Sequence, residues 1–405
     1  SEEPITHLTW FTDLLEQAQL RPAEHLLVTT LPGSYLDHFA HEHQVPSYPL
    51  QLDRGTGTGG RMSAPTTRVF LLPAALYLTR LSDEPGQLRK VLLHAWQEYN
   101  LALATERPAD HAFVQLAAAL SDASTDGACR MLLRMPEGWQ AFVPWVEQLM
   151  EESLGKGGKG VVVFDDQTLN RQAPGYRTGG AQAPQASLPL QVCVVTDRTQ
   201  SEGKDAFVLY QPSLASEEPR DRLAAVAASF LGWQLSMALY GYLQHITFAG
   251  QPAVENYKAR ARALRTRDDP LQVALNWAVT TTDGPLTLLA PQEGEAQGSP
   301  ASMFARTLQQ AVSVRDERVR LGYLDFTFNG EPSANISSVI GTHVYAIGNE
   351  LLGVPVKLRH APAAYHSTEQ SEMDGPPYLV SLRLLVRNHE ESVLGTYTCL
   401  LYTSP

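Results

Sequence analysis

The chain has little of what several common classes of protein require. Its 405 residues include three cysteines, Cys129, Cys193 and Cys399, which are widely spaced and odd in number. They form neither a disulfide framework nor a zinc-ligand pattern, so we expect a reducing, cytoplasmic environment. No apolar run approaches the roughly 20 residues that a membrane-spanning helix needs, and no signal peptide is recognisable. These absences predict a soluble protein with no membrane partner.

Positive charge is also scarce. The sequence has 31 Lys and Arg against 43 Asp and Glu, a formal net charge of −12, and its isoelectric point is near 5.5. This excess of negative charge repels nucleic acids and anionic membrane surfaces, so neither is expected as a general partner. A small anionic ligand is not excluded, because binding it needs only a local cluster of hydrogen-bond donors.

What the chain does have is the composition of a globular protein of two or three domains, with 43% hydrophobic and 18% charged residues. Apolar runs and patterns predict strands at residues 24–30, 45–50, 129–134, 161–164, 190–196, 206–210, 286–290, 322–329, 354–359 and 378–386. Helical spacing predicts helices at residues 8–18, 35–43, 71–78, 88–103, 111–120, 219–245, 254–264, 302–314 and 336–352. A further apolar-periodic helix carries Phe142, Trp145, Val146, Leu149 and Met150 and leads to Glu151 and Glu152. This alternation predicts an α/β fold with doubly wound, mainly parallel sheets.

The expected division is into two domains. Residues 1–160 form a first, partial α/β domain with a helical side, and residues 161–405 form a second. Residues 170–189 are rich in Gly, Ala, Gln and Pro and are predicted to be a linker or an exposed loop.

Residues 144–160, which read PWVEQLMEESLGKGGKG, form the most informative stretch. The predicted helix delivers two adjacent carboxylates, Glu151 and Glu152, to a glycine-rich end that carries Lys156 and Lys159. Taken alone, this is an amphipathic helix with a glycine exit and cations suited to its negative end. A nucleotide-binding P-loop is disfavoured, because its spacing and the Ser or Thr after the lysine are missing.

Four short segments share a recognisable order. Residues 59–63 read GGRMS and lead to FLLPAA at 70–75, residues 148–160 read QLMEESLGKGGKG, residues 251–258 read QPAVENYK, and residues 365–370 read YHSTEQ. Together they resemble the phosphoglucose isomerase family, most of all the form fused to transaldolase in some bacteria. The resemblance spans nearly the whole chain but begins midway through the family's first sugar-binding domain. The family's N-terminal part is therefore expected to be absent from this numbering, supplied by another chain, or lost.

The resemblance implies two sugar-isomerase (SIS) domains with doubly wound, mainly parallel sheets, the first incomplete. It implies interconversion of glucose 6-phosphate and fructose 6-phosphate with no metal and no organic cofactor. The reaction moves a proton between neighbouring carbons through an enediol, so one base must reach both carbons. By resemblance Glu152 is that base, Arg61 stabilises the enediolate and Lys258 lies near the sugar ring. Without the resemblance, Lys258 would be interpreted as a solvated lysine on a helix.

The resemblance also implies substrate contacts from all four segments and from the N-terminal stretch. These residues are Gly60, Ser63, Gln148, Ser153, Lys156, Gln251, His366 and Thr6.

Some positions depart from the family pattern. Residues 1–7 read SEEPITH, where the family has a loop of Ser, Lys, Gly and Thr that holds phosphate at the start of a helix. Glu2 and Glu3 would repel a phosphate dianion there. Glu369 replaces a family glycine. The ring-opening histidine stays unassigned between His245 and His366.

Two functions are therefore open. The first is a divergent glucose-6-phosphate isomerase. The alternative is a non-catalytic protein with the isomerase fold, acting as a sugar-phosphate sensor or as a structural, assembly subunit. In both cases the expected ligand is a sugar phosphate, and the resemblance implies a homodimer or assembly with another chain.

Overall fold

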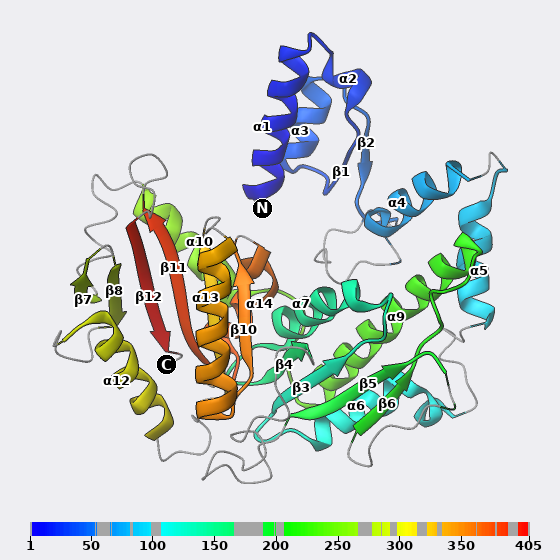
Figure 1. Ribbon diagram of the computed structural model, residues 1–405. Coiled ribbons are helices and arrows are strands. Elements are labelled where there is room, and N and C mark those ends of the chain that lie inside the picture. The colour runs from blue at the N-terminus through cyan, green and yellow to red at the C-terminus, as the bar shows by residue number, and fades with distance from the viewer. Residues whose placement is uncertain are drawn as a thin grey trace. The chain divides into compact units, whose positions relative to one another are not determined.

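The chain divides into two compact units in this computed structural model (Figure 1). Unit 1 comprises Ser1–Pro108 and Pro212–Gln234, and unit 2 comprises Ala109–Gln211 and Leu235–Pro405. The structure describes residues 2–52, 54, 65, 67–81, 84–98, 107–165, 189–197, 199, 206–265, 278–284, 286–291, 298–313, 322–329, 334–361, 363–376, 379–387 and 396–403. The predicted linker at residues 170–189 lies almost wholly outside this described part.

The first part of unit 1 is a small α/β module. It contains helices α1 (Glu2–Gln17), α2 (Pro22–His25) and α3 (Tyr35–Glu42) and strands β1 (Val28–Thr30) and β2 (Ser47–Pro49). β1 and β2 pair in parallel, and Val28, Ala40 and Val45 form a small core. The predicted strand at 24–30 is shorter than expected, because Pro22 begins a helix there with its fixed φ at the first turn.

The N-terminal stretch is helical and not a loop. α1 begins at Glu2, so Thr6, an expected phosphate contact, lies inside this helix. The resemblance to a phosphate-binding loop therefore does not extend to this stretch of the structure.

The rest of unit 1 is helical. α4 (Arg68–Thr79) and α5 (Gln87–Glu98) pack with the first part of α9 (Pro219–Leu243) through Phe70, Leu78, Val91, Ala224 and Ala227. α9 is long and apolar enough to cross a membrane, which sequence inspection missed, but 56% of its apolar window is buried in the fold. Its Trp233 and Tyr240 are fully buried, as is typical of a core helix in a soluble-type α/β fold.

Unit 2 contains a four-stranded, all-parallel sheet. Its strands are β3 (Ala128–Arg134), β4 (Gly160–Asp165), β5 (Leu190–Val195) and β6 (Ala206–Tyr210), in the order β4-β3-β5-β6. α6 (Ala112–Asp122) precedes β3, and α7 (Val143–Leu154) connects β3 to β4. The predicted domain boundary at residue 160 falls inside this sheet, because β4, β5 and β6 belong to the same sheet as β3.

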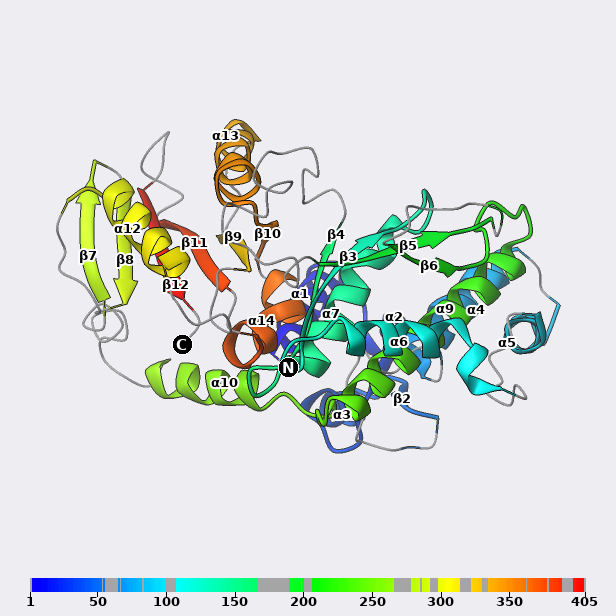
Figure 2. The ribbon, with the colours of Figure 1, turned by 90° about the horizontal axis from the view of Figure 1, so that it is seen from below.

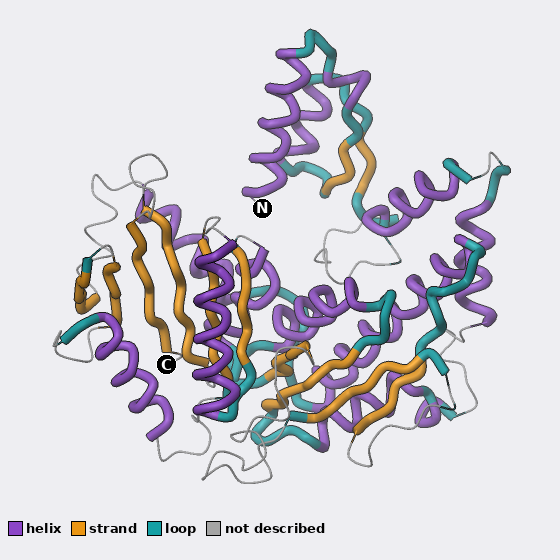
Figure 3. The backbone as a smooth tube through the Cα atoms, viewed as in Figure 1, coloured by secondary structure: helices purple, strands orange, loops and turns teal. Residues whose placement is uncertain are grey.

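A six-stranded mixed sheet forms the rest of unit 2 (Figure 3). Its strands are β7 (Ala278–Asp283), β8 (Leu286–Pro291), β9 (Tyr323–Asn329), β10 (Val356–His360), β11 (Leu379–Arg387) and β12 (Thr396–Thr403), in the order β10-β9-β11-β12-β8-β7. β12 runs antiparallel to β11, and β7 antiparallel to β8. Its helices are α10 (Pro252–Arg265), α12 (Pro300–Ser313), α13 (Ala334–Tyr345), a π-helical turn at Ala346–Leu352, and α14 (Ala363–Asp374). Sequence patterns did not predict β7, β12 or α14.

The two sheets of unit 2 share the arrangement of three consecutive strands. In the smaller sheet β3 lies between β4 and β5, and in the larger sheet β9 lies between β10 and β11. In each, the chain first goes to one side of the central strand and later returns to the other, which is the doubly wound pattern. The expected α/β fold class with mainly parallel sheets is confirmed.

The two faces of the larger sheet differ in polarity. Residues paired across parallel strands point to the same face, so Asp325, Lys357 and Ser381 share one face, followed by Arg359 and Arg383. The opposite face is apolar and packs on α12 and α13 through Met303, Leu324, Phe326, Phe328, Val344, Val356, Val380 and Leu384. A buried parallel sheet usually presents apolar residues on both faces, so the charged face needs its own explanation.

Candidate functional site

The carboxyl end of α7 is enclosed by the rest of unit 2. Residues 149–154 are all buried. Gly155, the C-cap, has a φ of −70°, and a Cβ there would lie 2.5 Å from the Cα of Ser371. Glycine is therefore required at this position because the backbone of α14 approaches it, and α14 packs closely on the end of α7.

Gln370 joins three elements at this point. Its Oε1 accepts hydrogen bonds from the backbone N–H groups of Ala253 (3.1 Å) and Val254 (3.4 Å), in the first turn of α10. Its Nε2 donates to the carbonyl oxygen of Gly155 at 3.0 Å. Figure 2 shows α14 beside both α7 and α10. One buried amide thus satisfies backbone groups at the start of one helix and the end of another.

Two lysines anchor the turn that follows α7. The Nζ of Lys156 donates to the carbonyl oxygens of Thr247 (2.6 Å) and Ala249 (3.2 Å). The Nζ of Lys159 donates to the carbonyl oxygen of Gln244 at 3.0 Å. Both cations therefore hold the segment that follows α9. For Lys156, which was predicted to contact substrate, these bonds favour an architectural role.

The predicted base lies in the same place. Glu152 is 7% exposed, and its Oε2 accepts a hydrogen bond from Nε2 of Gln148 at 3.0 Å, one helical turn earlier. Ser153 is fully buried beside it. The orientation of the Glu152 carboxylate is therefore set in part by a side chain of its own helix, which is what a base on a rigid element needs.

Two further predicted residues lie at or near the start of α10. Gln251 directly precedes the helix, and Lys258 lies two turns later. The Nζ of Lys258 is 3.6 Å from Oε1 of Glu255, and the lysine side chain is 34% exposed. Burial raises the pKa of the nearby Glu369 to about 7, with Arg383 and Lys258 opposing the shift and Glu372 adding to it. A carboxyl group thus stands near the predicted ring-binding lysine.

Deeper in unit 2, one ammonium group holds two carboxylates of α7. Nζ of Lys357 lies 2.6 Å from Oε1 of Glu147 and 2.5 Å from Oε1 of Glu151. Glu151 is fully buried, and its Oε1 also accepts the backbone N–H of Val163. Burial raises the pKa of Glu151 to about 7 against the opposing effect of Lys357. Burial acts to lower the pKa of Lys357, but the two carboxylates outweigh it and the pKa lies above its usual value.

The ionic network continues along the charged sheet face. Arg359 contacts Asp325 and Glu372, each at 2.5 Å, and Arg383 donates to Glu372 at 2.8 Å. Ser381 donates to Oδ2 of Asp325. Burial raises the pKa of Asp325, and Arg359 opposes the shift. The charged face of β9, β10 and β11 is therefore matched by acids on α7 and α14, which explains why charge is tolerated inside the unit.

Six of the predicted site residues lie in unit 2, on α7, α10 and the turns beside them. They are Gln148, Glu152, Ser153, Lys156, Gln251 and Lys258. His366 lies on α14, whose position in the chain was predicted as a motif but not as a helix. Thr6 lies in unit 1. Gly60, Arg61 and Ser63 lie outside the described residues.

Sequence inspection missed the buried ionic network. The available signal was the alternation of polar and apolar residues in YLDFTFN at 323–329 and VKLRH at 356–360. Such alternation marks a sheet face that differs from the other. The acids that neutralise Lys357 and Arg359 could not be identified, because only the pairing of β9 with β10 and the packing of α7 and α14 on the sheet bring them into contact.

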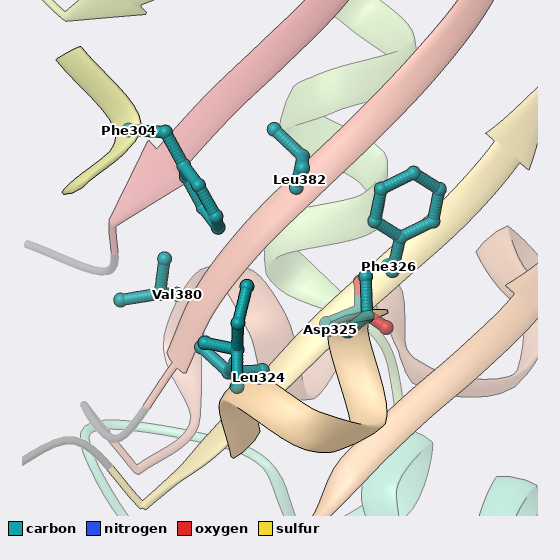
Figure 4. Close-up of a pocket in the computed structure, with 8 residues that line it drawn as sticks. Phe304, Leu324, Asp325, Phe326, Val380 and Leu382 are labelled. Atoms are coloured by element: carbon teal, nitrogen blue, oxygen red, sulfur yellow. The ribbon is translucent and has the colours of Figure 1, made fainter. Parts of the chain in front are cut away.

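A small cavity lies on the apolar side of the larger sheet (Figure 4). It has a volume of about 10 Å³ and is lined by Phe304, Leu324, Asp325, Phe326, Val344, Ile347, Val380 and Leu382. This volume accommodates about one water molecule, so this cavity is not a site for a sugar phosphate. Among the residues that the structure describes, no group of three or more His, Cys, Asp or Glu side chains is arranged to hold a metal ion.

Comparisons with known proteins give little beyond this geometry. No protein-family model matches the chain, and no curated protein matches it. A solved structure, the hypothetical protein TT0462 from Thermus thermophilus, is similar at a TM-score of 0.48 and 19% sequence identity, over 66% of this chain and 69% of that one.

Proposed function

We propose that the meeting point of α7, α10 and α14 is a sugar-phosphate site and that the protein is a divergent glucose-6-phosphate isomerase. The observation that supports this is the bridge made by Gln370. It joins Gly155 to Ala253 and Val254. These residues belong to three of the four segments that resemble phosphoglucose isomerases, and they are widely separated in the sequence. Their convergence in one unit is what a shared site requires.

In this proposal Glu152 carries out the proton transfer. Its carboxylate removes the proton from C2 of the open-chain aldose, the electron pair of that C–H bond forms the enediolate, and the same proton returns to C1 to give the ketose. The hydroxyl proton on C2 moves to the oxygen on C1. Gln148 holds the Glu152 carboxylate in place through its hydrogen bond, and a fixed base position is the main requirement of such a transfer. Lys258 would contact the sugar ring.

A second candidate is a non-catalytic sugar-phosphate sensor or assembly subunit. Two observations favour it. Lys156 and Lys159 already donate to backbone carbonyl oxygens, and Glu369 adds an acid beside Lys258. A lysine that already donates to carbonyl oxygens, or that lies near a carboxyl group, is less able to bind a phosphate dianion. Binding without turnover, or an architectural use of the fold, would follow from this arrangement.

The experiment is a coupled isomerase assay with fructose 6-phosphate on the wild type, Glu152→Gln and Glu137→Gln. Glu137 is an exposed acid outside the site and serves as the control. We expect Glu152→Gln to lower kcat/KM by about 10² to 10⁴-fold and Glu137→Gln to leave it unchanged. If neither the wild type nor Glu152→Gln shows isomerase activity at high enzyme concentration, the isomerase proposal is wrong.

A binding measurement then decides the second candidate. Thermal unfolding is followed with fructose 6-phosphate and with fructose, because a ligand that binds the native state raises the unfolding temperature. Stabilisation by the phosphate ester alone, without turnover, would support a sensor. If neither fructose 6-phosphate nor fructose raises the unfolding temperature, the sensor function is excluded and the second candidate is an assembly subunit alone.

The proposal extends to the environment of the protein. We place it in the cytoplasm, because Cys129 and Cys193 are buried and form no disulfide, and burial raises the pKa of Cys129 to about 12. By resemblance we propose a homodimer, which the molar mass in solution would test.

A further inference from the structure

Lys357 lies at the centre of a closed arrangement of charges and rings. Its side chain is 4% exposed, and its Nζ contacts the carboxylates of Glu147 and Glu151 on α7. The rings of Phe164 on β4 and Tyr323 on β9 lie 5.2 and 5.6 Å from the same Nζ. The ammonium group is thus held from one side by a helix and from others by two aromatic faces, a geometry in which cation–π attraction adds to the ion pairs.

The two carboxylates occupy one stripe of α7. Glu147 and Glu151 are four residues apart, so they lie one above the other on the same helix face. Because both bind one fixed cation, they set the rotation of α7 about its axis as well as its height along the axis. The backbone N–H of Val163 holds Glu151 at the same time, through a 2.8 Å hydrogen bond. We call Glu147, Glu151 and Lys357 the α7 clamp.

The neighbouring stripe of α7 carries the pair that the proposed reaction uses. Gln148 and Glu152 follow Glu147 and Glu151 by one residue each, and they are joined by their own hydrogen bond. Successive residues of an α-helix are turned by about 100°. The α7 clamp therefore determines where the Gln148–Glu152 pair points, without contacting the pair's proposed ligand.

We propose that Lys357 is a positioning residue for Glu152, acting through the two carboxylates of the α7 clamp. This inference rests on the proposed function for its catalytic consequence. Misplacing a reacting group by about 1 Å can cost on the order of 10²-fold in rate, so a looser α7 lowers kcat while leaving the contacts that set KM largely intact. If the α7 clamp only stabilises the fold, any well-folded variant that lacks the clamp keeps the kcat of the wild type.

The test removes the α7 clamp without leaving a buried charge unpaired. Lys357→Met alone leaves Glu147 and Glu151 uncompensated, which is expected to destabilise the fold. The triple variant Lys357→Met, Glu147→Gln, Glu151→Gln removes all three charges, and neutral replacement of a buried ionic cluster is commonly tolerated. Arg130→Met is the control, because Arg130 donates to the carbonyl oxygen of Gly322 at 3.2 Å and lies on β3, not on α7.

Isomerase kinetics give the first readout. We expect the triple variant to refold to near wild-type stability, with kcat lowered by about 10 to 100-fold and KM within about twofold. Adding Glu152→Gln to the triple variant should then cost less than it costs in the wild type, because the two changes affect one element. A triple variant with the wild-type kcat overturns the inference, as does a loss confined to KM.

A second readout does not depend on activity. Carboxyl ¹³C NMR of glutamate-labelled protein follows the titration of Glu152, assigned by its loss in Glu152→Gln. We expect this titration to move in the triple variant and to stay in place in Arg130→Met. If the wild type shows no isomerase activity, the proposed function fails and the NMR result alone decides the positioning role. An unmoved Glu152 titration in the folded triple variant then refutes it.

Discussion

The bridge made by Gln370 can be tested by replacing it with a side chain of similar length that cannot hydrogen-bond. Gln370→Met keeps the stem and most of the volume but leaves the N–H groups of Ala253 and Val254 and the carbonyl oxygen of Gly155 without their present partner. An unsatisfied buried group costs about 1 to 3 kcal/mol. The bond to Val254 is long at 3.4 Å and contributes least, so we expect a loss of about 2 to 4 kcal/mol in the free energy of unfolding.

Two measurements follow this change. Urea unfolding gives the global loss, and hydrogen exchange by mass spectrometry reports directly on the amides of Ala253 and Val254. The control is Gln140→Met, which removes one hydrogen bond, from Nε2 of Gln140 to the carbonyl oxygen of Met135, and should cost about 1 kcal/mol. The reasoning is refuted if Gln370→Met costs no more than Gln140→Met and the α10 amides stay protected.

Two further substitutions probe the same region. In Gly155→Ala the φ of −70° suits alanine, so the loss of about 1 to 3 kcal/mol that we expect in urea unfolding comes from crowding against Ser371. Gly157→Ala, with open space but a φ of +60°, should cost only about 1 kcal/mol, and equal losses would argue against the close approach. Glu369 has a pKa raised from 4.5 to about 7, so the folded protein keeps its proton while the unfolded chain loses it, and stability falls as pH rises between these values. Glu369→Gln should therefore be neutral at about pH 4 and stabilising by on the order of 1 kcal/mol at about pH 8, after allowance for solvent screening; a pH-independent effect would contradict the burial of this carboxyl group.

Sequence patterns predicted the elements that bury apolar residues. β3, β4, β5 and α7 carry continuous or periodic apolar runs, and each was found close to its expected bounds. α14 was missed for a physical reason. Its buried residues include Glu369, Gln370, Ser371 and Glu372, so it has no apolar stripe for a pattern to detect. β7 and β12 are rich in threonine, and their strand propensity was a usable signal.

The site was predictable only in part. Resemblance placed Glu152, Gln251 and Lys258 in one functional group, and these residues lie in unit 2. Neither periodicity nor resemblance identified Lys357 or Arg359. A charged residue in a strand can be recognised as buried only when the residue that neutralises it is known. The partners Glu147 and Glu372 lie 210 and 13 residues away from them, and only the packing of α7 and α14 on the sheet brings them into contact.

Adjacent carboxylates on α7 have different surroundings, and this difference bears on function. Glu151 faces a cation, Lys357, and a backbone N–H group, Val163, in the interior. Glu152 faces the neutral amide of Gln148. The ion pair with Lys357 ties the Glu151 carboxylate to the sheet, whereas the amide of Gln148 orients the Glu152 carboxylate along the helix. Glu151 is therefore committed to holding α7 against the sheet, and in the proposed function Glu152 is the carboxylate that meets the ligand. Removing the α7 clamp should therefore affect Glu152 through the position of α7, whereas Gln148→Glu removes the hydrogen bond to Glu152 and leaves the α7 clamp in place.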